Sequence, residues 1–295
     1  MKVKLQADQL INFHKLHRRT SMNRIIGGQL DKWITTSCVV VAVALGAPQD
    51  GLAQTSVPFA ITDNSFLVEE ALNQEPGIFQ NILNVRRSNS GAWQTVFTQE
   101  WPVVTQRHQL SYTIPYASID GTSGVGDAFV HYRLQLFDGN DARPAFSPRV
   151  SLIIPSGTNG LGNGSFGWEL NLPFSKQVRD VYFHWNAGMT HLPSARIEGQ
   201  DYNLLTPHIA GSAIWRTRPM FNLMFESVVD WEEGAVDGQT SRRTTVTLLP
   251  GFRTGWDVGE SQIIVGLGLP FVIRGDADSA GIFLYFSYEL PFVRH

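Results

Sequence analysis

The sequence has little charge, a single cysteine and hardly any long apolar runs. Asp, Glu, Lys and Arg make up 17% of its 295 residues, against about 25% in average soluble domains. Its mean hydropathy is nevertheless close to zero, at -0.09. A helical protein with many membrane spans would show several apolar runs of about 20 residues, and a disordered chain would be poor in aromatic residues. The composition excludes both classes and leaves one question, which is why a chain with so little charge is not more hydrophobic.

The one modest apolar run, Val39–Ala47, lies near the N-terminus. Basic residues precede it and the small residues of Gly51–Ala53 follow it, which is the pattern of a secretory signal peptide with its cleavage site. We therefore predict that residues 1–53 are a cleaved leader, with Met22 as a possible true start. An uncleaved membrane anchor is the alternative, but the run is short for a span and Pro48 follows it closely.

The only cysteine, Cys38, lies within this leader, so a mature chain beginning at Gln54 has none. This excludes disulfides, thiolate catalysis and zinc sites with cysteine ligands. The leader carries seven Lys or Arg and three Asp or Glu, so a net charge of -3 for the whole chain leaves about -7 for the mature part. Such an acidic, exported chain is a poor candidate for nucleic-acid binding, and we expect no nucleic-acid partner.

Apolar and polar residues alternate with a period of two along most of the mature chain. In segment 180–190, one face carries apolar residues such as Phe183 and Trp185, and the other carries polar residues such as His184 and Asn186. This period predicts β-strands. The segments with this pattern, strong or weak, are 78–87, 93–102, 106–116, 124–137, 146–155, 165–175, 180–190, 202–215, 219–231, 243–254, 260–272 and 282–292.

The connections between these twelve segments alternate in length. The odd ones, such as His191–Asp201 and Glu232–Arg242, are mostly long and polar, whereas the even ones, such as Val103–Thr105, are mostly short. Long external loops, short periplasmic turns and strands of about 9–11 residues are typical of outer-membrane β-barrels. The glycine-rich stretch Gly157–Gly167 precedes a strand, not the helix that a phosphate loop needs, so we expect a mobile external loop there.

We therefore predict an all-β fold over residues 78–295, an antiparallel up-and-down transmembrane β-barrel of about twelve strands in the outer membrane of a Gram-negative bacterium. A closed barrel pairs every backbone group, as lipid requires. Apolar side chains facing lipid and polar ones facing the lumen would explain why the mean hydropathy is near zero. A soluble β-sandwich or an enclosed soluble barrel is the alternative, but such folds rarely place so many Trp, Phe and Leu residues on the outward register.

Several short motifs resemble a known family. They are Glu69–Gly77, Gly124–Asp127, Tyr132–Arg133, Pro155–Gly157 and Tyr288–Phe292. They resemble a group of bacterial outer-membrane transporters similar to the β-barrel family named for the meta-cleavage (MetA) pathway of phenol degradation, and the resemblance covers about residues 65–292. It implies a porin-like barrel for transport of small apolar or aromatic solutes, in contact with outer-membrane lipid and the outer-membrane assembly machinery. The family supplies no catalytic residues and no cofactor.

The polar residues on the inward faces are the candidate pore-lining residues. By register they are Asp127, His131, Arg133, Glu169, His184, Asn186, His208, Glu226, Asp230 and Arg253. Residues in a lumen set the size and charge selectivity of a pore. The alternative is an interior polar network that fills and stiffens the barrel without transport. A twelve-stranded barrel lies between filled eight-stranded barrels and open porins, so both interpretations stay open.

Residues 54–77 precede the first predicted strand and form a periplasmic or lumenal segment. It carries Glu69, Glu70 and Glu75 among apolar residues. An acidic plug of this kind would gate a lumen lined by arginine. The other interpretation is a periplasmic tail without a role, and it is the one we favour on the sequence.

Some outer-membrane barrels modify lipids, so an enzyme is a further alternative, as is a structural or surface-interaction barrel. Acyl transfer needs a nucleophile within hydrogen-bond reach of a base. His208 and Ser212 share a strand face but lie four residues apart, too far for direct contact. A metal site would need His131, His184 and His208 to converge, which the sequence does not indicate. We expect no catalytic residues, no metal and no cofactor.

Overall fold

The computed structural model describes residues 61, 63–236, 238–259, 261–275 and 278–292. The predicted leader, residues 1–53, lies outside these ranges, as do residues 54–60. Every regular element in the described part of the chain is a β-strand. No helix among these residues is long and apolar enough to cross a membrane.

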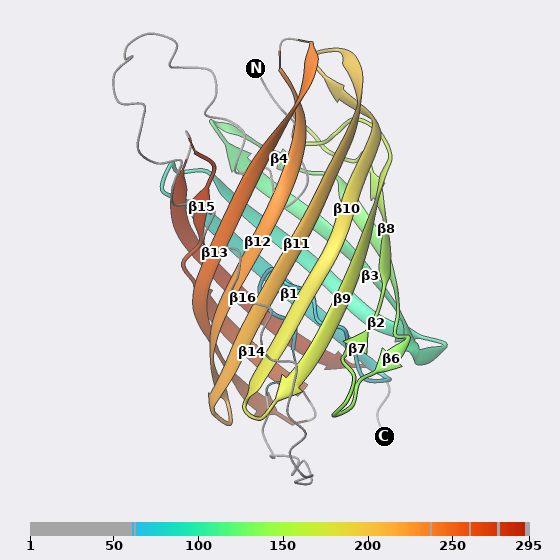
Figure 1. Ribbon diagram of the computed structural model, residues 1–295, viewed down its shortest axis with the longest axis vertical. Coiled ribbons are helices and arrows are strands. Elements are labelled where there is room, and N and C mark those ends of the chain that lie inside the picture. The colour runs from blue at the N-terminus through green and yellow to red at the C-terminus, as the bar shows by residue number, and fades with distance from the viewer. Residues whose placement is uncertain (1–60, 62, 237, 260, 276–277, 293–295) are drawn as a thin grey trace.

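Twelve antiparallel strands form the wall of a closed barrel (Figure 1). They are β1 (Ile78–Ser88), β2 (Trp93–Val103), β3 (Thr105–Ile119), β5 (Ala128–Leu134), β8 (Arg149–Ile154), β9 (Gly167–Val178), β10 (Val181–Ile197), β11 (Gln200–Arg218), β12 (Phe221–Val236), β13 (Gln239–Val258), β14 (Ser261–Gly268) and β16 (Ser279–Pro291). Each pairs with the next, and β16 pairs with β1 along its whole length. Where all twelve strands run side by side, closure leaves no unpaired sheet edge. The predicted all-β, up-and-down barrel and its twelve strands are confirmed.

Two of the predicted strands are interrupted in the structure. Segment 260–272 divides into β14 and a short β15 (Phe271–Ile273), because Pro270 has no N–H to donate to the ladder. Segment 124–137 divides into β4 (Thr122–Val125), β5 and part of a small hairpin, β6 (Phe137–Asp138) with β7 (Ala145–Phe146). The break before β5 falls at Gly126 and Asp127, and the Asp127 side chain accepts hydrogen bonds from a loop.

Two segments predicted as long loops are strand in the structure. Within 191–201, β10 and β11 continue to a two-residue turn, Glu198–Gly199, in which both residues have positive φ. Such a turn matches the twist of a β-hairpin. Strands β12 and β13 likewise continue through most of 232–242. β13 has 20 residues, about twice what a bilayer crossing needs, so these strands rise above the rest of the wall (Figure 1). We call this end the long-hairpin rim.

The two faces of the wall differ as the alternation predicts. On β10, Phe183 and Trp185 are each 39% exposed on the outer face, whereas His184 and Asn186 are 4% and 5% exposed on the inner face. The same division holds on β12, where Phe225 points outward and Glu226 inward. The wall therefore presents an apolar exterior and encloses a polar interior, which answers the question raised by the composition.

The outward register makes a testable prediction about stability in a bilayer. Phe225 lies about midway along the stretch of β12 from Phe221 to Trp231, which we take as its bilayer-crossing part, and Val258 lies at the end of β13; both face outward. We expect Phe225→Arg to lower the free energy of unfolding in lipid vesicles by about 2–4 kcal/mol, and the control Val258→Arg by about 0–1 kcal/mol. Denaturant titration in vesicles measures both. Equal losses would show that Phe225 does not face the bilayer midplane.

Candidate functional site

Residues 63–76 lie inside the barrel, and we call this segment the lumenal strap. Hydrogen bonds join it to side chains on β13, β12, β10, β9, β5 and β3 in turn, before β1 begins at Ile78. The strap therefore crosses the lumen from one side of the wall to another. This placement corrects the periplasmic tail favoured on the sequence, because polar side chains of the inner wall supply the partners that the strap backbone needs.

Acceptors on the wall bind the N–H groups of the strap. The carboxylate of Glu226, fully buried, accepts from Phe66 and Leu67 at 2.7 Å each and from Val68 at 3.3 Å. Further along, Asn186 Oδ1 accepts from the N–H of Glu69 at 2.8 Å. The remaining N–H bonds run from Ala71 to Ser175, from Asn73 to Gln135 and from Gln74 to Gln109.

Donors on the wall bind the carbonyl groups of the strap. Arg253 donates to the carbonyl oxygens of Asp63 and Asn64 at 2.9 and 2.5 Å. Arg133 donates to those of Glu70 and Leu72 at 3.0 and 2.8 Å, and to the Asn73 side chain at 2.8 Å. Asn186 and Ser147 donate to the carbonyl groups of Glu69 and Ala71. The strap is thus held along both edges of its backbone.

The strap also takes part in a charge network within the lumen. Glu69 pairs with Arg133 and with Arg149, each at 3.1 Å. Arg149 also pairs with Glu169, and Arg133 lies 3.9 Å from Glu100. Removing one member of such a buried network leaves its partners uncompensated. Of the three glutamates predicted for a plug, Glu69 is part of this network. Glu70 is held through its backbone carbonyl, which Arg133 bonds, and Glu75 is exposed.

An aromatic ring anchors the first part of the strap. Phe66 packs against Phe283 and Tyr285, with ring centroids 5.3 and 5.4 Å apart. Glycines on β13 and β14 make room for it: a Cβ atom added at Gly266 would come within 2.5 Å of the Phe66 ring, and one at Gly251 within 2.8 Å. The inward glycines of these strands therefore form a recess for one aromatic side chain.

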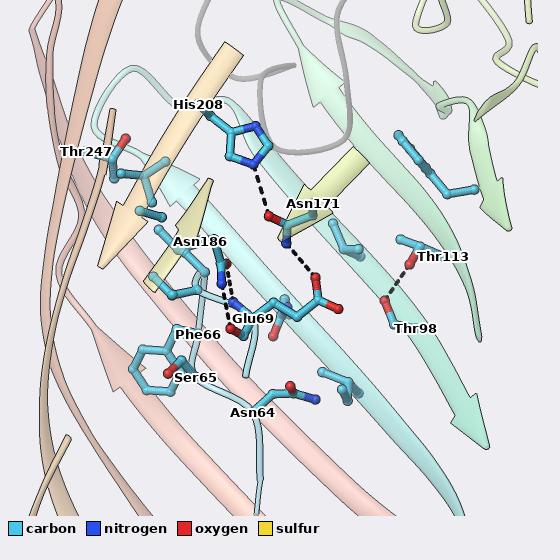
Figure 2. Close-up of a pocket in the computed structure, with 18 of the residues that line it drawn as sticks. Asn64, Ser65, Phe66, Glu69, Thr98, Thr113, Asn171, Asn186, His208 and Thr247 are labelled. Carbon is cyan, nitrogen blue, oxygen red and sulfur yellow. Dashed lines mark hydrogen bonds between the residues drawn. The ribbon is translucent and has the colours of Figure 1, made fainter. Parts of the chain in front are cut away.

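A cavity of about 280 Å³ lies between the strap and the long-hairpin rim. On β12, Glu226 binds the strap, and Val228, Asp230 and Glu232, the next inward positions toward that rim, line the cavity. Figure 2 shows one side of the cavity, where Asn171 bonds two neighbours. Its Nδ2 donates to Glu69 Oε2 at 2.7 Å, and its Oδ1 lies 3.4 Å from His208 Nε2. The apolar part of the lining consists of Phe66, Leu67, Val68, Ile82, Val96, Phe129, Ala210, Val228 and Phe283.

Asp127 binds the glycine-rich loop after β8 and does not line the cavity. Its Oδ1 accepts from the N–H of Gly157 at 2.9 Å and its Oδ2 from that of Asn163 at 2.5 Å. Leu161, in the same loop, is buried in an apolar cluster with residues of the β1–β2 connection and β3. The structure therefore shows a loop that is held in place, where the sequence predicted a mobile one.

We expect Asp127→Ala to loosen this loop. The substitution leaves the N–H groups of Gly157 and Asn163 without their charged acceptor, which lowers the free energy of loop opening by about 1.5–3 kcal/mol. Amide hydrogen exchange at these two residues measures the change. Asp141→Ala, in the exposed connection between β6 and β7, is the matched control and should leave the exchange unaltered. Equal exchange in the two variants would contradict the role of Asp127.

All ten candidate residues lie on the inner side of the wall, but they do different things. Asp127 holds the loop, and His184 bonds Ser175 at 2.7 Å. The residues that hold the strap are Arg133, Asn186, Glu226 and Arg253. The residues that line the cavity are His131, Glu169, Asn186, His208 and Asp230.

Sequence reasoning did not single out several wall residues that bind the strap. These are Glu100, Gln109, Gln135, Ser147, Arg149 and Ser175. The alternation places Ser175 on the inner face of its strand. The alternation of polar and apolar residues does not show whether an inward serine or glutamine binds the strap or contacts water.

In the described residues, no serine hydroxyl bonds an imidazole that is in turn bonded to a carboxylate. Ser212 Oγ lies 3.0 Å from Ser65 Oγ, and His208 bonds Asn171, so these two candidates do not meet. His131 bonds Ser151 and Thr113 through its two ring nitrogens. Among the described residues, no group of three or more His, Cys, Asp or Glu side chains could hold a metal ion.

The sequence matches no protein-family model and no curated protein. Among solved structures, it is similar to an outer membrane channel from Pseudomonas putida F1, with 16% identity, a TM-score of 0.57, and coverage of 78% of this chain and 98% of that one. It is also similar to the NanC porin (11% identity, TM-score 0.45, coverage 71% and 98%) and to the transport unit of the autotransporter AIDA-I from Escherichia coli (9%, 0.39, 76% and 93%). The similarity to the Pseudomonas channel shows that this chain has the fold of an outer-membrane β-barrel.

Proposed function

We propose that this protein is an outer-membrane channel for the passive passage of small molecules, and that the lumenal strap restricts the opening. The observation that carries the proposal is the cavity of about 280 Å³ inside a closed barrel, with the strap as its floor. The apolar exterior fits a membrane location. The strands pair with one another all the way round the barrel, so the backbone groups that would lie in lipid are hydrogen-bonded within the protein. The fold shared with the Pseudomonas channel supports the same role.

The lining of the cavity favours solutes with an apolar or aromatic face. Phe66, Phe129 and Phe283 line it together with polar groups such as Asn171 and His208. Its volume lies near the lower end of small-molecule sites, which measure about 300–1,000 Å³. A small molecule that combines a ring with one or two hydrogen-bonding groups fits such a lining best. Membrane lipid and the outer-membrane assembly machinery are the further partners of a barrel of this kind.

A lipid-modifying enzyme has less support. The imidazoles of His131 and His184 contact the hydroxyl groups of Ser151 and Ser175, but Ser175 also accepts the N–H of Ala71 in the strap. Within the described residues, neither imidazole forms a hydrogen bond to a carboxylate that would orient it as a base. These contacts instead belong to the polar interior that holds the strap.

Solute flux into vesicles tests the proposal. In a liposome-swelling assay, we expect purified full-length protein to admit a pentose faster than a disaccharide. Ala210→Trp should slow the flux, since Ala210 lines the cavity. Ala213→Trp is the matched control, because it places the same ring on the outer face of the same strand, β11. No flux through folded protein, or equal flux in the two Trp variants, would contradict a route through this cavity.

A further inference from the structure

The buried carboxylates of Glu226 and Asp127 are bound by N–H groups of the chain, whereas that of Glu232 is not. Glu232 is 1% exposed and lines the cavity on its rim side, and neither of its carboxylate oxygens has a hydrogen-bond partner among the described residues. Arg274 Nη2 lies 3.7 Å from Glu232 Oε1, so the two form an ion pair without a hydrogen bond. A buried acceptor without a donor is costly, which leaves this carboxylate available to the donors of a ligand.

Gln94, on β2, has the opposite hydrogen-bonding character. It is 2% exposed and lines the cavity, and its Nε2 has no acceptor in the part of the chain that the structure describes. Arg86, which also lines the cavity, lies directly opposite Gln94 in the register of β1 and β2. A guanidinium group and an amide N–H side by side offer positive charge and donors, the combination that binds a carboxylate. The cavity thus has a site for an anionic group in addition to the acceptor at Glu232.

The two sites lie on different parts of the wall. Three strands, β13, β15 and β16, separate Glu232 on β12 from Arg86 on β1, which amounts to four strand spacings of about 4.8 Å each. Asp230, two residues before Glu232, also lines the cavity. Arg243 lies opposite Glu232 in register and Arg274 pairs with it, so guanidinium groups offset the carboxylates at this end. A ligand with a net charge therefore meets like charges in the cavity, whereas one that carries both charges, well separated, can place each beside its opposite.

Apolar side chains line the cavity next to both sites. Ala210 and Val228 lie directly opposite each other in the register of β11 and β12, and Val228 is the next inward residue from Asp230 toward the strap. Phe283 lies opposite Arg86 in the register of β16 and β1. A ligand that reaches both sites therefore needs an apolar body between its two charged groups.

We infer that the cavity binds a zwitterion with an ammonium group and a carboxylate at opposite ends of a small apolar body. The ammonium group, which has three donors, binds Glu232 beside Asp230, and the carboxylate binds Arg86 and Gln94. The class comprises amino acids whose amino and carboxyl groups are separated by a ring or by several carbon atoms. The inference rests on the proposed function, since it names the class of solute that this opening selects.

Three matched probes test the need for both charges. They are 4-(aminomethyl)benzoate, 4-ethylbenzoate, in which a methyl group replaces the ammonium, and 4-methylbenzylamine, in which a methyl group replaces the carboxylate. Each is titrated by calorimetry into the purified full-length protein in detergent and, as a reference, into detergent alone. We expect the zwitterion to bind at least about tenfold more tightly than either analogue, because each analogue lacks one set of charge-assisted hydrogen bonds.

Neighbouring glutamates on β12 provide the matched variants. Glu232→Gln keeps the shape of the side chain and removes its charge, so the affinity for the zwitterion should fall about tenfold. The same variant should leave the affinity for 4-ethylbenzoate unchanged, because that probe has no ammonium group. Glu233→Gln is the control, since Glu233 pairs with Arg242 and does not line the cavity. Circular dichroism checks that both variants fold.

Several outcomes overturn the inference. They are an absence of zwitterion binding, equal binding of the three probes, and equal loss of affinity in the Glu232→Gln and Glu233→Gln variants. Liposome swelling with a pentose, measured on the same protein, separates this inference from the proposed function. A protein that admits the pentose but does not bind the zwitterion refutes the zwitterion site alone. A protein that binds the zwitterion in the expected order of affinities but admits no solute supports the site and refutes passage through the cavity.

Discussion

Deletion of residues 63–75 is expected to raise the single-channel conductance several-fold. The strap crosses the lumen and forms the floor of the cavity, so its removal opens the barrel from one end to the other. The deletion ends before β1 begins at Ile78 and leaves the β1–β16 pairing that closes the wall untouched. Planar-bilayer recording of the deleted and full-length proteins in the same salt measures the effect.

The control for this deletion is Glu75→Gln in the full-length chain, since Glu75 is an exposed strap residue. It should leave the conductance close to that of the unaltered protein. The deleted protein must also be shown to be folded, by its circular dichroism and its resistance to proteases. A folded deletion variant with unchanged conductance would mean that the strap does not restrict the pore.

The second large effect is expected from Arg133→Met. Arg133 is 2% exposed and bonds two strap carbonyl groups, the Asn73 side chain and the carboxylate of Glu69. Methionine keeps much of the volume but leaves Glu69 and Glu100 in the interior without this cation. Breaking a buried ion pair in this way costs about 3–5 kcal/mol, and we expect a loss of that size in the free energy of unfolding.

Arg107→Met on β3 is the matched control, because Arg107 pairs with Asp138 while 58% of its side chain stays exposed. Exposed pairs contribute about 0–1 kcal/mol. A double variant, Arg133→Met with Glu69→Gln, should recover part of the lost free energy of unfolding, because it also removes the negative charge that Arg133 pairs with. Equal losses for the two single variants would contradict the buried network.

The wall could be predicted from the sequence because a period of two fixes the face of each residue. On β12 the alternation places Phe225 outside and Glu226 inside, as the structure shows. The alternation no longer identifies strands beyond the part of the wall that would face lipid. The polar composition of 191–201 resembles a loop, since lipid no longer demands apolar residues there, yet β10 and β11 continue pairing to the turn at Glu198–Gly199.

The strap could not be predicted in the same way. The alternation identifies Glu226 as an inward residue, but its partners Phe66, Leu67 and Val68 lie about 160 residues away in the chain. Register within a sheet says nothing about a segment that crosses the lumen without pairing in the wall. Asp127 illustrates a second limit, because its face is inward, as predicted, while its partners are the N–H groups of a loop.

The most direct test of the account asks whether the strap lies against the inner wall of the folded, membrane-embedded protein. Ser65 Oγ and Ser212 Oγ are 3.0 Å apart, on the strap and on β11, so the two side chains point at each other, as the formation of a disulfide requires. The predicted mature chain has no other cysteine, so the pair Ser65→Cys and Ser212→Cys should form an intrachain disulfide without a catalyst, seen by mass spectrometry after alkylation. The pair Ser65→Cys and Ala213→Cys, with the second residue on the outer face, should remain reduced. Two free thiols in the first pair would contradict a strap in the lumen.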